Sequence, residues 1–137
     1  PAIEDSVSRW NQLYDRLAAH FRKMDGVIIP ARRQEEFYVG SSIQFRAEGL
    51  DRSQIPALMA SCAVRGVELK WFGDDTPKAF TSRYDSWKYI DDIPHLPGTL
   101  SVLEKTLDMR VPLTFDLDDC DLIAHIIDEE VSVLMAA

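Results

Sequence analysis

The sequence predicts an α+β fold: a two-layer sandwich in which about four helices pack on a small, mostly antiparallel sheet. Residues 3–24 and the segment after Asp116 carry apolar side chains at steps of three and four, which is typical of helices with one buried face. Short segments rich in β-forming residues alternate with shorter helical segments between them. The 137 residues are enough for one domain with its own core.

The first elements are marked by glycines. A helix over 3–24 is expected to end at Gly26, and short strands are expected over 27–29 and 37–45. Gly40 indicates a bulge or a close approach of two backbone segments.

The second half predicts a helix, a strand and a long loop, followed by a helix, a strand and a last helix. Asp51 and Gln54 favour a capping box for a helix that ends at Gly66, and a strand follows over 67–72. The aromatic segment 78–93 is expected to be a long loop with one short strand, a type of segment that often carries function. A helix over 96–107 and a strand over 109–113 lead to the last helix, whose start is rich in acidic residues: Asp116, Asp118, Asp119 and Asp121. We interpret these residues as a helix cap, because the pattern of a calcium loop is missing.

Composition excludes several classes of protein. A net charge of −8 disfavours binding to nucleic acid. No apolar run is long enough to cross a membrane, and no signal peptide is visible. Cys62 and Cys120 lie far apart in apolar helical patterns, so we expect free buried thiols, no metal site and a cytoplasmic protein.

Motifs of catalysis are absent from the sequence. The six glycines are too far apart for a phosphate-binding loop, and no Gly-x-Ser-x-Gly motif occurs. The best candidates for substrate binding are Lys70, Trp71 and Phe72 at the end of a predicted strand, together with Arg83 in the loop. Arg83 is suited to a carboxylate or phosphate, and an aromatic ring could pack on a planar ligand. In the alternative interpretation, Trp71 and Phe72 are core residues, and Lys70 and Arg83 are solvated.

An ordered set of weaker motifs resembles the carboxyl-terminal end of the DegT/DnrJ/EryC1/StrS aminotransferases. The similar segments run in order along the chain: Arg9-Trp-Asn-Gln-Leu-Tyr14, Arg65-Gly-Val-Glu68, Leu96-Pro97, Val111-Pro-Leu113 and Phe115-Asp-Leu-Asp-Asp119. Where the family usually shows a His-Tyr pair, this chain has Lys70-Trp71-Phe72-Gly73. The nature of the substrate therefore stays open.

The resemblance implies a fold and a role. Residues 1–25 would form a connecting helix, and 26–137 the small α/β domain of a longer enzyme that depends on pyridoxal phosphate. That enzyme would transfer an amino group from an amino acid such as glutamate to a keto substrate such as a keto sugar nucleotide. The cofactor lysine would precede Pro1, so this chain alone would bind no cofactor. Its partners would be the missing large domain, a small-molecule substrate and a second copy in a homodimer.

Two alternatives involve no catalysis. The chain could be a free-standing ligand-binding or regulatory module, or a dimerisation domain that uses the aromatic stripe of Trp10, Tyr14 and Phe21 on its first helix.

Overall fold

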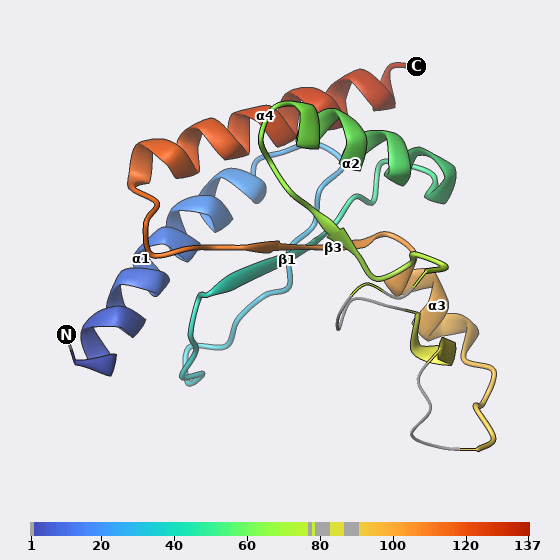
Figure 1. The fold of residues 1–137 in the computed structure, drawn as a ribbon, viewed down its shortest axis with the longest axis horizontal. Coiled ribbons are helices and arrows are strands. Elements are labelled where there is room, and N and C mark those ends of the chain that lie inside the picture. Colours follow the sequence, from blue (N-terminus) through green and yellow to red (C-terminus); the bar gives the residue numbers. More distant parts are fainter. Residues whose placement is uncertain (1, 77, 79–82, 87–90) are drawn as a thin grey trace.

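A three-stranded antiparallel sheet lies at the centre of the molecule. The computed structural model describes residues 2–76, 78, 83–86 and 91–137. The strands are β1 (Ser42–Arg46), β2 (Lys70–Trp71) and β3 (Thr106–Arg110), and their order in the sheet is β1-β3-β2. The strand that comes last in the sequence is thus the central one, and both of its neighbours run antiparallel to it (Figure 1).

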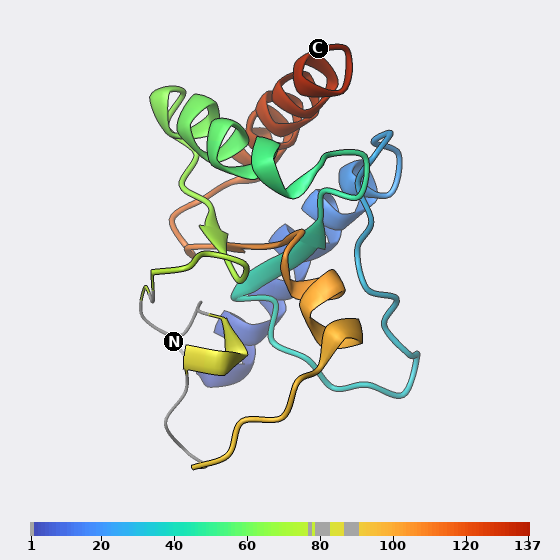
Figure 2. The same cartoon turned by 90° about the vertical axis from the view of Figure 1, so that its right-hand side faces the viewer.

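Three helices cover one face of this sheet, and the fourth lies on the other side. Helices α1 (Ile3–Phe21), α2 (Ile55–Val64) and α4 (Leu117–Met135) form the covering layer. The short helix α3 (Pro97–Leu103) and the 3₁₀ turn η2 (Tyr84–Ser86) lie on the opposite side from α2 and α4 (Figure 2). A second 3₁₀ turn, η1 (Arg52–Gln54), leads directly into α2. The predicted α+β sandwich with a small antiparallel sheet and about four helices is confirmed.

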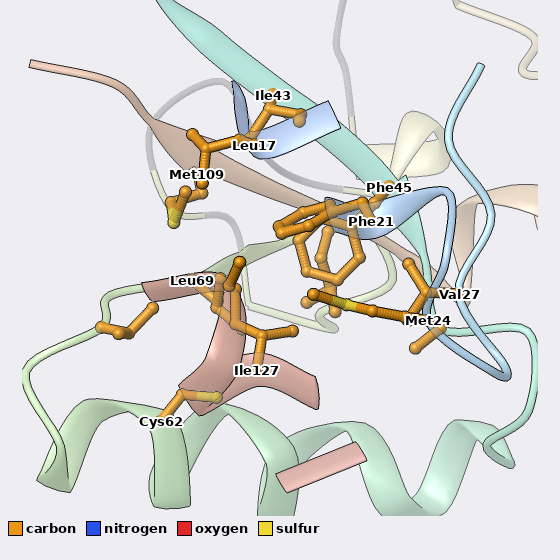
Figure 3. Close-up of a cluster of buried hydrophobic side chains, with 14 of the residues drawn as sticks. Leu17, Phe21, Met24, Val27, Ile43, Phe45, Cys62, Leu69, Met109 and Ile127 are labelled. Atoms are coloured by element: carbon orange, nitrogen blue, oxygen red, sulfur yellow. The ribbon is translucent and has the colours of Figure 1, made fainter. Parts of the chain in front are cut away.

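One apolar core joins the helical layer to the sheet. Leu17 and Phe21 of α1 face Ile43 and Phe45 of β1 inside this core, where all four side chains are fully buried (Figure 3). The Phe21 and Phe45 rings meet edge to face with their centroids 4.9 Å apart. Burial of each such side chain stabilises the fold by about 1.5–3 kcal/mol. The first helix is therefore part of the core of this domain.

The start of α4 confirms the cap predicted from the acidic residues. The Asp116 carboxylate accepts a hydrogen bond from the Asp119 backbone N–H at 2.8 Å, and the Asp119 carboxylate accepts one from the Asp116 N–H at 2.9 Å. This reciprocal pair satisfies two backbone donors at the end of the helix. The helix continues to Met135, close to the carboxyl terminus.

Asp121 has a different role, which is to tie α4 to α1. Its carboxylate accepts two hydrogen bonds from Arg16, each at 2.6 Å, and lies 2.6 Å from Nε2 of His20. These contacts, those of Arg16 first, lower the pKa of Asp121 to about 2.

The ends of α2 also agree with the sequence. The Gln54 side chain accepts a hydrogen bond from the Asp51 N–H at 2.9 Å, as a capping box requires. Gly66 ends the helix with a φ of 87°, a conformation that other residues rarely adopt.

The strands are shorter than predicted. In place of the strand expected over 27–29, only Ile28 pairs, as an isolated bridge to Arg46. Similarly, the expected strand 37–45 begins at Ser42, and the expected strand 67–72 is reduced to Lys70–Trp71. The reason is that a residue belongs to a strand only where a partner strand runs beside it, and the local sequence does not show this.

The predicted boundary between α3 and β3 was also wrong. The helix expected over 96–107 ends at Leu103, and Leu107 is a buried strand residue that pairs with Phe45. Pairing across the sheet thus prevails over the helical spacing of the leucines. A long loop with one short strand was expected over 78–93. Residues 79–82 and 87–90 of this segment lie outside the described residues, so the expected strand stays a prediction. The described part contains the turn η2.

Residues 30–41 form an extended strap that lies against α1. At Gly40 an added Cβ would lie 2.4 Å from the Cβ of Tyr14, so only glycine allows this approach. The Gly40 N–H donates to the Asn11 side chain at 2.8 Å, and the Asn11 amide donates to the Tyr38 carbonyl at 3.0 Å. The close approach predicted at Gly40 is confirmed.

The Asp121 contacts make a prediction about acid stability. A carboxyl group whose pKa is lowered by folding stabilises the protein above its unfolded pKa of about 4, and this contribution is lost as the pH falls toward 2. Asp121→Asn should therefore lower the urea midpoint at pH 7, and its difference from the parent protein should shrink as the pH falls through 2 and vanish below it. Asp118→Asn is the matched control on the same turn and should change little. Equal pH profiles for Asp121→Asn and the parent would contradict the assignment.

Candidate functional site

The strand β2 places three of the four candidate residues at one edge of the sheet. Lys70 is in register with Asp108, and Trp71 is in register with Leu107. The Phe72 backbone N–H extends the pairing by donating to the Thr106 carbonyl at 3.0 Å. Because successive side chains of a strand point to opposite faces, Lys70 and Trp71 point to opposite faces of the sheet.

Trp71 is a core residue. Its side chain is buried, and its indole N–H donates to the Glu104 carbonyl at 2.8 Å. The guanidinium of Arg52 lies over the indole with its carbon 5.1 Å from the ring centroid. Trp71 therefore fixes the position of its neighbours, which agrees with the structural interpretation of this aromatic residue.

Arg83 lies in a row of alternating charges. Its guanidinium donates two hydrogen bonds to Asp85, at 3.0 and 2.6 Å, and one to Asp75 at 2.9 Å. Arg52 donates to the same Asp75 oxygen at 3.1 Å and to the Gly73 carbonyl at 3.2 Å. We call these four side chains the arginine–aspartate row: Arg52, Asp75, Arg83 and Asp85.

The row shifts the pKa values of its members in opposite directions. The Asp85 and Asp75 carboxylates raise the pKa of Arg83 above its ordinary value. Hydrogen bonds from Arg83, and then from Arg52, lower the pKa of Asp75. Hydrogen bonds from Arg83 also lower the pKa of Asp85. Asp75 is the most exposed member of the row, with 70% of its side chain accessible to solvent.

A small cavity of about 70 Å³ lies beside this row. Its lining includes Arg52, Phe72, Gly73, Arg83, Leu100 and Glu104. The structure therefore brings Phe72 and Arg83 to one cavity, and it adds Arg52, which the sequence analysis did not identify. Arg52 lies in the turn before α2, and no local motif connects it to residues 72–83.

Lys70 lies in a separate and larger groove, of about 780 Å³. The groove borders α2, α4 and the end of β3 that extends past β2, and it has an apolar part that includes Met109, Phe115 and Ile123. Its charged lining residues are Glu68, Lys70, Asp108 and Arg110. The four candidate residues thus lie in three places: Lys70 in this groove, Phe72 and Arg83 at the small cavity, and Trp71 in the core.

Asp108 is a buried acid that the sequence analysis did not identify. It is fully buried, and its Oδ1 accepts a hydrogen bond from the Gln44 side chain at 2.5 Å, whereas its Oδ2 has no hydrogen-bond partner among the described residues. Gln44, Asp108 and Lys70 face one another in register across all three strands. They form a polar row on the face of the sheet opposite to the core. The sequence feature that could have identified Asp108 is a single acid between two apolar residues, in Leu107-Asp108-Met109. It was missed because the predicted helix extended to residue 107.

Other kinds of site find no support in the part of the chain that is described. No group of three or more His, Cys, Asp or Glu side chains there is arranged to hold a metal ion. No helix among these residues is long and apolar enough to cross a membrane.

Solved structures of aminotransferases share this fold. No protein-family model and no curated protein matches the sequence. The chain is similar to the aminotransferase TlmJ from Streptoalloteichus hindustanus, with a TM-score of 0.71 at 19% identity over 93% of this chain and 32% of that one. The sugar aminotransferase CalS13 from Micromonospora echinospora gives a TM-score of 0.73 at 16% identity over 93% of this chain and 31% of that one. For 3-amino-5-hydroxybenzoic acid synthase the TM-score is 0.73 at 15% identity, over 95% of this chain and 35% of that one.

The polar row makes a prediction about stability. Asp108→Ala should remove the acceptor of Gln44 and cost about 1–3 kcal/mol of unfolding free energy. Gln44→Ala removes the same hydrogen bond, so the double variant should be less destabilised than the sum of the single variants by at least about 0.5 kcal/mol. Urea denaturation of the four proteins measures this coupling, and strict additivity would show that the two side chains do not interact.

The three matches to aminotransferase structures cover similar shares of this chain and of those enzymes. The chain spans about a third of the length of the solved structures it matches, and nearly the whole chain takes part in each match. The fold that the resemblance implied is confirmed: the chain has the fold of about one third of an aminotransferase.

Proposed function

We propose that this chain is the carboxyl-terminal small domain of a longer aminotransferase of the DegT/DnrJ/EryC1/StrS type, which depends on pyridoxal phosphate. The observation that carries the proposal is the match of over nine tenths of the chain to a third of several aminotransferases. The ordered motifs of the sequence support the same family. The proposed reaction moves an amino group from an amino acid such as glutamate to a keto substrate.

In this proposal residues 1–25 form the connecting helix and 26–137 the small domain, which closes over the active site of a large domain. The helix α1 contributes Leu13, Leu17 and Phe21 to the domain core, so the 137 residues should fold without the large domain. Tyr14 and Phe21 of the aromatic stripe are buried in the core of this chain, which does not favour the alternative of a dimerisation domain that uses this stripe. A homodimer of the full enzyme remains part of the proposal.

The residues of this chain do not fit the cofactor. Pyridoxal phosphate requires a lysine for its aldehyde and a cradle of donors for its phosphate. The lysine in the large groove, Lys70, is in register with the buried acid Asp108, and the glycines are too dispersed for a phosphate loop. We therefore assign the cofactor to the large domain and derive no step of its chemistry from this chain.

The substrate contacts proposed for this chain come from Lys70, Phe72 and Arg83, with Trp71 as their support. Arg83 is held by Asp85, and it shares the exposed Asp75 with Arg52. A carboxylate or phosphate of the substrate could exchange for Asp75 while Asp85 keeps Arg83 in position. Two positively charged side chains would then face the anion, which is the usual way in which proteins bind such groups.

The class of the keto substrate is left open between two possibilities. Some of the similar structures are sugar aminotransferases, which favours a keto sugar nucleotide. Another is named for an aminohydroxybenzoic acid, so the fold alone does not select a sugar. The Lys70-Trp71-Phe72 sequence, where the family usually has His-Tyr, also leaves a different keto substrate possible.

The state of the two cysteines indicates the kind of cellular compartment in which the protein works. Cys62 and Cys120 are buried and free, and burial raises the pKa of each thiol to about 11. Such thiols are inert and suit a reducing compartment, and we propose the cytoplasm.

Pyridoxal phosphate itself provides the test of the division between domains. Added to the isolated 137-residue chain, it should give no specific visible absorbance from an aldimine, whereas the full-length enzyme should show this absorbance and lose it when glutamate is added. Specific aldimine formation on the isolated chain, abolished by Lys70→Met, would overturn the assignment of the cofactor to the large domain. A full-length enzyme without any aldimine would overturn the proposed function.

Arg83 can be tested in the full-length enzyme. Arg83→Ala should raise the KM for the anionic substrate about tenfold or more, because a hydrogen-bonded charge contact of about 1.5–3 kcal/mol is lost. Arg83→Lys should recover part of this loss, since it restores the charge but not the two-pronged geometry. Arg22→Ala, at an exposed position after α1, is the control. Unchanged kinetics of Arg83→Ala would remove this residue from the site.

A further inference from the structure

The guanidinium of Arg32 lies in a notch formed by two tyrosine rings. Its carbon is 4.4 Å from the ring centroid of Tyr14 and 4.0 Å from that of Tyr38. The two ring centroids are 5.5 Å apart, and the ring planes meet at 61°. These three distances place the guanidinium at the open side of a corner between the rings and not between two parallel rings. Cation–π attraction to both rings holds it there.

Arg32 has no oxygen partner in the described part of the chain. It makes no hydrogen bond and no ion pair with those residues, and its Nε is buried without a partner. Its position contrasts with that of five other arginines, each of which donates to a carbonyl or carboxylate: Arg9, Arg16, Arg52, Arg65 and Arg83. A buried donor left unpaired costs about 1–3 kcal/mol. An unpaired group of this kind is uncommon in a folded protein and requires a structural explanation.

The notch is held in place by contacts that do not use Arg32. The Tyr38 hydroxyl donates to Oδ1 of Asp15 at 2.7 Å, and the Tyr38 carbonyl accepts from Asn11 at 3.0 Å. Burial and the Asp15 carboxylate raise the pKa of Tyr38 to about 12, so its hydroxyl keeps its proton and its bond to Asp15 at neutral pH. The strap 30–41 is thus attached to α1 through both the hydroxyl and the backbone carbonyl of Tyr38. The Arg32 guanidinium is therefore held in position before a ligand binds.

We propose that Arg32 anchors an oxyanion site that takes the carboxylate or phosphate group of a small organic anion. Both tyrosine rings contact the guanidinium from within this corner, and its terminal N–H groups, which are not among the buried unpaired atoms, remain for the ligand oxygens. Phe37 on the same strap is fully exposed, and Val39 is half exposed, so an apolar body can lie beside the anionic group. The strap and the turn η2, which carries part of the arginine–aspartate row, lie on opposite sides of the view in Figure 2, so this site is distinct from the cavity at Arg83. The inference does not depend on the proposed aminotransferase function.

The test follows the Nε–H signal of Arg32 by nuclear magnetic resonance in the 137-residue chain. Sodium acetate and inorganic phosphate are titrated separately at constant ionic strength set with chloride. Each anion that binds should shift this signal saturably, with a dissociation constant of ~1–10 mM, as expected for a ligand of so few atoms. Tighter binding of acetate identifies a carboxylate site, and tighter binding of phosphate identifies a phosphate site.

Variants separate binding from a purely structural role of Arg32. Because these variants lack the Arg32 signal, their binding is followed, like that of the parent chain, by the backbone amide signals of residues 32–38. Arg32→Gln should weaken binding about tenfold or more, and Arg32→Lys should weaken it less. Arg33→Gln, which removes the adjacent exposed guanidinium, should bind as the parent chain does. Tyr38→Phe keeps the ring but removes the bond to Asp15 that helps to fix the notch, so it should weaken binding less than Arg32→Gln does. Circular dichroism confirms that each variant is folded.

Two results would overturn the proposal. The first is a parent chain whose Arg32 signal shows no saturable shift with either anion. The second is a folded Arg32→Gln or Arg32→Lys variant that binds both anions as tightly as the parent chain. If Arg32→Gln does not fold, the parent signal and the Arg32→Lys variant still decide the question.

Discussion

The pairing of β3 with both of its neighbours is the constraint on which the rest of the structure depends. β1 and β2 do not contact each other in the sheet, and each is held by a strand that follows it in the sequence by some tens of residues. This pairing brings Leu107 beside Phe45 and Trp71, and it presents one apolar face to three helices. Without β3 there is no sheet for α1 and α4 to cover. The contacts are of long range, so the chain must close large loops before it gains their stabilisation.

The alternation of side chains along β3 separates the structural side of the sheet from its polar side. Leu107 and Met109 point into the core, and Asp108 between them points to the other face, where it meets Gln44. The candidate substrate contacts lie at the edge of this polar face and in the turns beside it. Residues that hold the fold and residues available for chemistry are therefore neighbours in sequence but lie on opposite faces.

Arginine side chains carry most of the specific polar geometry, and their partners distinguish their roles. Arg16 joins two helices through Asp121. Arg52 and Arg83 share Asp75 at the edge of a small cavity, where an exposed carboxylate could give way to an anionic substrate. Arg32 rests on two aromatic rings with its nitrogen donors unpaired in the described residues. In a chain with a net charge of −8, these arginines are the features that favour anionic ligands.

The sequence by itself determined the features that depend on local interactions. The two long helices, the cap of α4 at Asp116, the end of α2 at Gly66 and the close approach at Gly40 were predicted correctly, because each depends on residues a few positions apart or on the missing side chain of glycine. The first helix, expected over 3–24, is shorter than predicted and ends at Phe21. The α+β class followed from the order of these elements. The lengths of the strands, the boundary of β3 and the burial of Asp108 were decided only by the tertiary structure, since they require partners more than twenty residues away. For the same physical reason Phe72 and Arg83 could be proposed from their chemistry, whereas Arg52, Asp75 and Arg32 became visible only when folding brought their neighbours to them.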